Sequence, residues 1–190
     1  MLATILLLGL VLLATVTDLA RHKIYNWTTY TGMLAALGLS AAGSVWLYCG
    51  GGSEDQWQSW GWIPIWDSLM GLVVCGLVML MCFVMFRVGG GDVKLIAMLG
   101  AFLGPEQGIT AMLWTFVLGG CVGVIVLVWR VGPLRLAVRV LRQVLWTLRL
   151  GRWSPLSESE RAQLQPPLFL APSALAAVLI VRFLSADWLF

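Results

Sequence analysis

Long apolar stretches separated by short polar ones dominate the chain. Three of them, Thr28–Tyr48, Trp66–Phe86 and Ile109–Trp129, are about 20 residues long, which is the length that an α-helix needs to cross a bilayer. Two more, Leu2–Thr17 and Leu168–Leu184, reach this length if their ends are extended by a few residues. The pattern therefore predicts membrane-spanning helices.

The remaining apolar stretch, Leu95–Leu103, is short for a span and taken alone would suit a re-entrant segment. The distribution of basic residues favours a crossing. With the N-terminus outside and six crossings, the inner connections 21–27, 87–94 and 130–167 hold 11 of the 12 basic residues, all except Arg182. Basic residues gather on the inner side of membrane proteins. We therefore predict an all-α, polytopic membrane helix bundle with about six transmembrane helices.

Composition agrees with this interpretation. Of the 190 residues, 60% are hydrophobic and 11% are charged, and the mean hydropathy is +0.91. A soluble domain carries about 25% charged residues, so a soluble fold and a disordered chain are both excluded. The net charge of +3 is too small for a nucleic-acid-binding protein built on basic patches. A signal peptide is the weaker interpretation of the N-terminus, because the first apolar stretch lacks a basic start and ends at Asp18.

The inner connection after Trp129 contains an amphipathic segment, 134–151, in which arginines recur on one side and leucines on another. We expect a helix that lies in the inner headgroup layer and is attracted by anionic lipid. A helix that binds a protein partner is the alternative. The segment 154–167 is a predicted polar linker, and the whole chain, 1–190, is expected to form a single membrane-embedded domain.

Cysteine and histidine offer no metal site in the sequence. The four cysteines contain no CxxC pair, and the one histidine, His22, lies in a basic connection without ligand-like neighbours. We expect no metal and no cofactor.

Two aspartates differ from the other acidic residues, which lie in outer connections or in the polar linker. Asp18 lies at the inner end of the first span, and Asp92 directly follows the three glycines 89–91. Each has a simple structural explanation: Asp18 could pair with Arg21 or His22 along one helix face, and Asp92 could cap a helix that begins at Val93. Ionisable groups at such a depth are nevertheless functional candidates by default.

Together, the two aspartates suit one kind of chemistry. Two carboxyl groups a few ångströms apart do not both ionise easily, so they share a proton. The ionised carboxylate can take a proton from water while the protonated one polarises a scissile carbonyl group. Glycines before Asp92 would permit unusual backbone angles and the close approach of an extended substrate. This arrangement predicts peptide-bond hydrolysis at the membrane edge.

The residues around both aspartates resemble those of a known family. The segment Gly89–Gly100, GGGDVKLIAMLG, is similar to the GxGD-x-K-L-x-A-x-x-G signature of type IV prepilin peptidases. The segment Asp18–Trp27, DLARHKIYNW, resembles the family's first motif, in which an aspartate and a basic run precede Ile-Pro-Asn. The resemblance implies catalytic roles for Asp18 and Asp92, a loop shaped by Gly89 and Gly91, and a supporting role for Lys94.

The resemblance also implies an aspartic endopeptidase of the prokaryotic inner membrane, which removes the short basic leader from prepilin or pseudopilin substrates at the cytoplasmic face. The chain lacks the zinc-binding region of the larger members, so it resembles the short branch that serves tight-adherence pili and has no methyltransferase activity.

One residue departs from the family pattern: Tyr25 stands where the family has proline. Tyrosine does not restrict φ as proline does, so the turn after the first span is less constrained. This leaves two alternatives open. One is a catalytically degenerate homologue that acts as an assembly subunit of a pilus or secretion machine, and the other is a proton-coupled carrier that uses the same aspartates.

Overall fold

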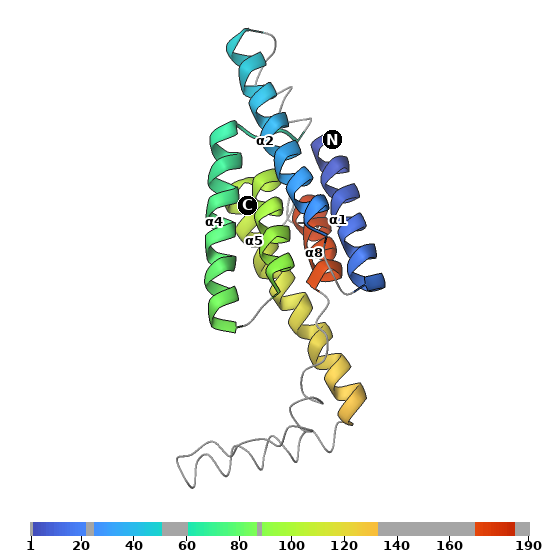
Figure 1. Cartoon of the computed structure of the whole chain (residues 1–190). Helices are drawn as coiled ribbons and strands as arrows, with labels where there is room; N and C mark the ends of the chain where they lie inside the picture. Colours follow the sequence, from blue (N-terminus) through green and yellow to red (C-terminus); the bar gives the residue numbers. More distant parts are fainter. Residues whose placement is uncertain (1, 22–24, 51–60, 87–88, 133–169, 185–190) are drawn as a thin grey trace. The chain divides into compact units, whose positions relative to one another are not determined.

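A computed structural model of the chain describes residues 2–21, 25–50, 61–86, 89–132 and 170–184. Every regular element within these ranges is helical (Figure 1), which confirms the prediction of an all-α membrane bundle. The elements are α1 (Leu2–Arg21), α2 (Asn26–Tyr48), α4 (Ile65–Phe86), α5 (Gly90–Val131), α8 (Leu170–Leu179) and the π-helix η1 (Ile180–Leu184). Four of the described helices, α1, α2, α4 and α5, are long and apolar enough to cross a membrane.

The chain divides into two compact units, Met1–Leu118 with Phe169–Phe190, and Gly119–Leu168. The first unit contains α1, α2, α4, most of α5, α8 and η1, and it also contains both aspartates. The second contains the last part of α5 among the described residues. The predicted amphipathic helix 134–151 and the predicted linker 154–167 lie outside the described residues.

The helices follow the apolar stretches closely, with two informative differences. Helix α1 continues past the predicted end at Thr17 to Arg21, so Asp18 belongs to the helix. The last apolar stretch forms only the ten residues of α8 before η1 begins at Ile180. Helix α1 packs against both α2 and α8, and α2 also packs against α4.

Helix α5 is interrupted at Gly104, where φ is 80° and ψ is 178°. This backbone conformation is open essentially to glycine alone. Pro105 follows, and proline is well suited to the first position of a helix. A Cβ atom at Gly108 would lie 3.0 Å from the Cα of Gly100, whereas residues this far apart in a straight helix are separated by about 12 Å. The chain therefore reverses direction at Gly104, so the predicted fourth and fifth apolar stretches form separate helical halves.

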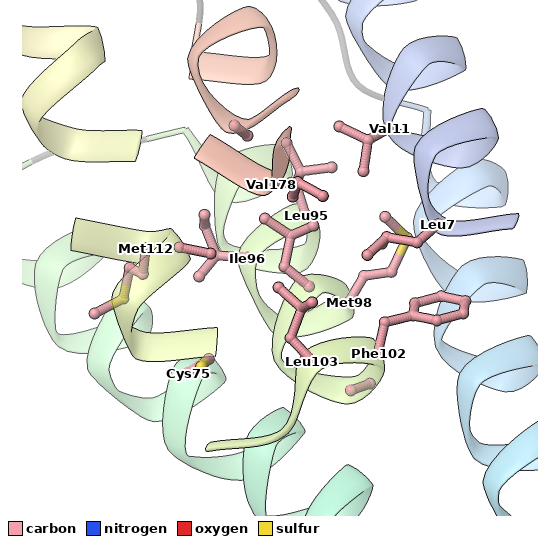
Figure 2. Packing of buried hydrophobic residues seen from close by; sticks show 14 of the residues in the cluster. Leu7, Val11, Cys75, Leu95, Ile96, Met98, Phe102, Leu103, Met112 and Val178 are labelled. Atoms are coloured by element: carbon pink, nitrogen blue, oxygen red, sulfur yellow. The ribbon is translucent and has the colours of Figure 1, made fainter. Parts of the chain in front are cut away.

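The first half of α5 forms the centre of the core (Figure 2). Leu95, Ile96 and Met98 are at most 1% exposed, and they pack with buried side chains from α1, α4, α8 and the start of the second half of α5. Large apolar side chains on the outward faces of α1 and α4, such as Ile5 and Val84, are exposed. Extensive exposed apolar surface is typical of helices that face lipid.

Helices α4 and α5 approach each other closely because both carry small residues at their contact. A Cβ atom at Gly71 would collide with the backbone carbonyl group of Gly100, and a Cβ atom at Gly100 would collide with that of Gly71. One turn away, the buried hydroxyl group of Ser68 donates a hydrogen bond of 2.7 Å to the carbonyl oxygen of Ala101. Small residues and hydroxyl groups are the usual means of helix packing in membranes, and here they hold the helix that carries Asp92.

Candidate active site

Asp18 lies in the last turn and a half of α1 and is 9% exposed, although it is a charged residue type. One turn before it, the hydroxyl group of Thr15 donates hydrogen bonds to the carbonyl oxygens of Val11, at 2.8 Å, and Ala171 of α8, at 3.2 Å. The second bond joins α1 to α8 next to the aspartate. The position of Asp18 is therefore determined by a packed, hydrogen-bonded part of the bundle.

Asp92 is the third residue of α5, which begins at Gly90. The expectation that Asp92 would cap a helix beginning at Val93 is wrong, because the helix starts earlier and includes the two preceding glycines. Its side chain instead turns back to the start of the helix, where the backbone N–H of Gly89 donates a hydrogen bond to the carboxylate. The backbone N–H of Asp92 donates in turn to the carbonyl oxygen of Gly89, at 3.0 Å. This reciprocal pattern resembles a capping box and fixes the direction of the carboxylate.

The glycines before Asp92 do not adopt the unusual backbone angles that we expected. None of Gly89, Gly90 and Gly91 has a positive φ, so none needs the conformational freedom of glycine. The absence of a side chain matters at Gly89. A Cβ atom at Gly89 would lie 2.9 Å from Oδ2 of Asp92, whereas a Cβ atom at Gly90 would have an ordinary contact of 3.9 Å with the ring of Phe83. Gly89 therefore leaves room for the carboxylate of Asp92.

The fold brings the two aspartates together. The carboxylate of Asp18 is close enough to that of Asp92 for the two negative charges to repel each other. Asp18 lies in the last turn of one helix and Asp92 in the first turn of another, far along the chain. Both belong to the same compact unit. The site thus consists of two neighbouring carboxyl groups, one of them buried and the other partly buried. Two carboxyl groups that interact in this way are candidates for acid–base chemistry.

Lys94, the predicted supporting residue, contacts the first turns of α2. Its Nζ donates a hydrogen bond of 2.8 Å to Oδ1 of Asn26, and it lies 4.9 Å from the centroid of the Tyr30 ring. A cation over an aromatic face at this distance is favourable. The sequence analysis included Asn26 in the first motif without giving it a role, and it did not single out Tyr30. Their spacing of four residues, which places both on one face of α2, was the available signal.

Tyr25, the residue that replaces the family's proline, directly precedes α2 with φ −73° and ψ 130°. Proline fixes φ at about −65°, so tyrosine here adopts the backbone angle that proline would impose. Its hydroxyl group accepts a hydrogen bond of 2.6 Å from Nη1 of Arg21, the last residue of α1. The turn therefore keeps a proline-like backbone and has an additional side-chain contact.

Among the described residues, no group of three or more histidine, cysteine, aspartate or glutamate side chains is placed to hold a metal ion.

Two interacting carboxyl groups within a helical membrane bundle mark a candidate functional site. Comparison with known families identifies the kind: the sequence profile of the type IV leader peptidase family matches residues 5–124. The chain belongs to the type IV leader peptidase family, and this membership implies a peptidase. The matched range includes both aspartates and the segment around Lys94. A comparison with curated protein sequences and a comparison with solved structures each found no match to the chain.

Proposed function

We propose that this protein is a membrane-embedded aspartic endopeptidase that removes the short basic leader from prepilins or prepilin-like proteins. We place the reaction at the cytoplasmic face of a prokaryotic inner membrane, with the N-terminus of the enzyme outside, and we propose no methyl transfer. The observation that carries the proposal is the electrostatic contact between Asp18 and Asp92, within a chain that belongs to a peptidase family.

The proposed mechanism uses one protonated and one ionised carboxyl group. The ionised group takes a proton from a water molecule, whose oxygen attacks the carbonyl carbon of the scissile peptide bond. The protonated group donates a hydrogen bond to the carbonyl oxygen and so stabilises the negative charge that develops there. The tetrahedral intermediate then collapses, and a proton from the pair passes to the leaving amine. The pair ends the cycle with the single proton with which it began.

The position of the site suits a substrate that itself crosses the membrane. Asp18 ends α1 and Asp92 begins α5, so the pair lies at the ends of apolar helices rather than halfway along them. The leader of a prepilin is short and basic, so a cleavage site next to it would suit the headgroup region. At that depth, water is available for hydrolysis. The basic residues in the connections 21–27 and 87–94 support the cytoplasmic side as the location.

The proposal is tested by replacing each aspartate with asparagine, which is nearly isosteric but does not transfer protons in the same way. Co-expression with the candidate prepilin and a gel assay for loss of the leader measure the activity. We expect Asp18→Asn and Asp92→Asn each to reduce cleavage by at least about a thousandfold, while membrane insertion and thermal stability stay near those of the parent. Asp67→Asn is the matched control, because Asp67 is an exposed carboxylate in the first turn of α4.

Normal cleavage by either asparagine variant would overturn the paired-carboxylate mechanism. The two alternatives give other results. An assembly subunit would tolerate both substitutions and would leave the prepilin uncleaved in every variant. A carrier would show substrate-dependent proton movement in vesicles and no cleavage.

A further inference from the structure

The first turns of α2 are contacted by cationic side chains from two other helices. From α5, Lys94 donates a hydrogen bond of 2.8 Å to Oδ1 of Asn26 and lies over the ring of Tyr30. Lys94 and Asn26 are 68 residues apart in the sequence, so this contact depends entirely on the tertiary structure. It joins the start of α5 to the start of α2.

From α1, Nη1 of Arg21 donates a hydrogen bond of 2.6 Å to the hydroxyl group of Tyr25, and the guanidinium carbon lies 5.9 Å from the centroid of the same ring. Tyr25 accepts this contact from the position directly before α2, and its own carbonyl oxygen accepts a hydrogen bond from the backbone N–H of Thr28, at 3.1 Å. The phenol therefore connects the end of α1 to the start of α2.

Both cations lie within one helical turn of an aspartate. Arg21 follows Asp18 by three residues in α1, and Lys94 follows Asp92 by two residues in α5. A helical turn is rigid over this distance, so holding either cation also holds the neighbouring carboxyl group. Lys94 contacts the start of α2, and Arg21 contacts Tyr25 directly before it.

We propose that Arg21, Tyr25, Asn26, Tyr30 and Lys94 form an α2 clamp that sets the separation of the two carboxyl groups. This inference rests on the proposed function, for which it supplies the positioning residues. Hydrogen bonds that involve a charged donor are stronger than neutral ones, and the Lys94 and Arg21 contacts are both of this kind. The clamp also explains how a tyrosine serves at position 25, because its side chain supplies a link to α1 that a proline would lack.

The α5 side of the clamp is tested with Lys94→Met, which keeps the length of the side chain and removes the charge. We expect kcat for prepilin cleavage to fall about ten- to a hundredfold, because misplacement by up to 1 Å has effects of this size, and KM to change less than threefold. Lys94→Arg should restore most of the activity. Asn26→Ala should lower kcat in the same direction, and the double variant should be no worse than the poorer single variant.

The α1 side is tested by the same logic with Arg21→Ala and Tyr25→Phe. Phenylalanine keeps the ring and removes the hydroxyl group that accepts the hydrogen bond. We expect each variant to lower kcat severalfold and the double variant to add nothing further, because both remove one contact. Additive effects at either pair of residues would overturn the proposed link. Tyr30→Leu is also expected to lower kcat. Its matched control is Tyr48→Leu, at the far end of the same helix, where the side chain is 94% exposed and the substitution should leave kcat unchanged.

A readout that does not depend on activity measures the separation of the two positions directly. The variant Asp18→Cys with Asp92→Cys is treated in membranes with a short bifunctional thiol reagent, and the intramolecular cross-link is quantified on gels. The two single-cysteine substitutions report the background from the native cysteines. We expect efficient cross-linking in the double-cysteine variant that keeps Lys94. Adding Lys94→Met to this variant should lower the cross-linked fraction at least threefold.

The two readouts separate the failure of the clamp from the failure of the proposed function. Unchanged cross-linking after Lys94→Met would overturn the clamp, even if cleavage fell. If the unaltered chain cleaves no prepilin, the proposed function fails, and the cross-linking still decides whether the clamp holds the two positions together.

Discussion

Gly89→Ala is the substitution that most directly tests the steric role of the glycine before Asp92. A Cβ atom at residue 89 would lie 2.9 Å from Oδ2 of Asp92, and ordinary contacts begin at 3.4 Å. The carboxylate oxygen must therefore retreat by about 0.5 Å. The backbone can remain in place, because φ at Gly89 is not positive and the displaced atom is the end of a flexible side chain.

The displacement predicts a loss of activity that exceeds the loss of stability. A misplacement of 1 Å in an active site can lower the rate about a hundredfold, so half of that distance predicts about a tenfold fall in kcat. Alanine directly before a helix costs about 1 kcal/mol of stability or less compared with glycine, because it caps the helix less well. Gly89→Ser separates the two effects: serine caps a helix well but introduces the same Cβ atom, so its stability should match that of the parent while kcat falls.

The assay combines initial rates of leader removal in purified membranes with thermal unfolding of the same preparations. Gly90→Ala is the matched control. A Cβ atom there meets only the ring of Phe83, at 3.9 Å, and alanine is the better helix former by about 1 kcal/mol. This variant should therefore keep the parent rate and unfold at the same or a higher temperature. Full activity of both Gly89 variants, or an equal loss in Gly90→Ala, would refute the steric argument.

Two further predictions concern the stability of the bundle. Gly104→Ala should lower the free energy of unfolding by about 1–3 kcal/mol, because φ there is 80° and alanine is strained at that angle. Gly38→Ala is the control and should not lower the free energy of unfolding, because a Cβ atom there meets nothing within 4 Å. Equal thermal unfolding of the two variants would contradict the assigned break in α5. Thr15→Val should lower the unfolding free energy by about 1 kcal/mol through loss of the bond to Ala171 of α8. Thr17→Val is its control, because among the contacts described the hydroxyl group of Thr17 bonds only within α1. An equal loss of stability in both variants would refute the α1–α8 link.

Much of the architecture could be predicted from the sequence, because the physical cause is local. A helix that crosses lipid must satisfy its own backbone hydrogen bonds and must be apolar throughout, so the positions of α1, α2 and α4 follow from the apolar stretches. The separation of the two halves of α5 was predictable for the same reason, since Gly104 and Pro105 interrupt an otherwise continuous apolar region. Motif spacing indicated Asp18 and Asp92 as candidates, because the residues that surround each aspartate are contiguous in the chain.

What the sequence could not supply is the relation between the two motifs. Whether two carboxyl groups lie within range of each other depends on how α1, α2 and α5 pack, and helix packing is decided by contacts between residues that are distant in the chain, such as Lys94 with Asn26. The spacing also suggested unusual backbone angles at Gly89, whereas φ there is not positive and a Cβ atom would crowd the carboxylate of Asp92.

Tyr25 illustrates the same division. As a residue type it carries no preference for the φ of −73° that it adopts, and its departure from the family's proline suggested a looser turn. The bond from Arg21, four residues earlier in the chain, supplies a restraint that the residue type alone does not indicate. Local sequence thus determined where the helices form and which residues are candidates for the chemistry. Tertiary packing alone decided whether those residues meet, because the energy that brings them together comes from contacts that exist only in the folded bundle.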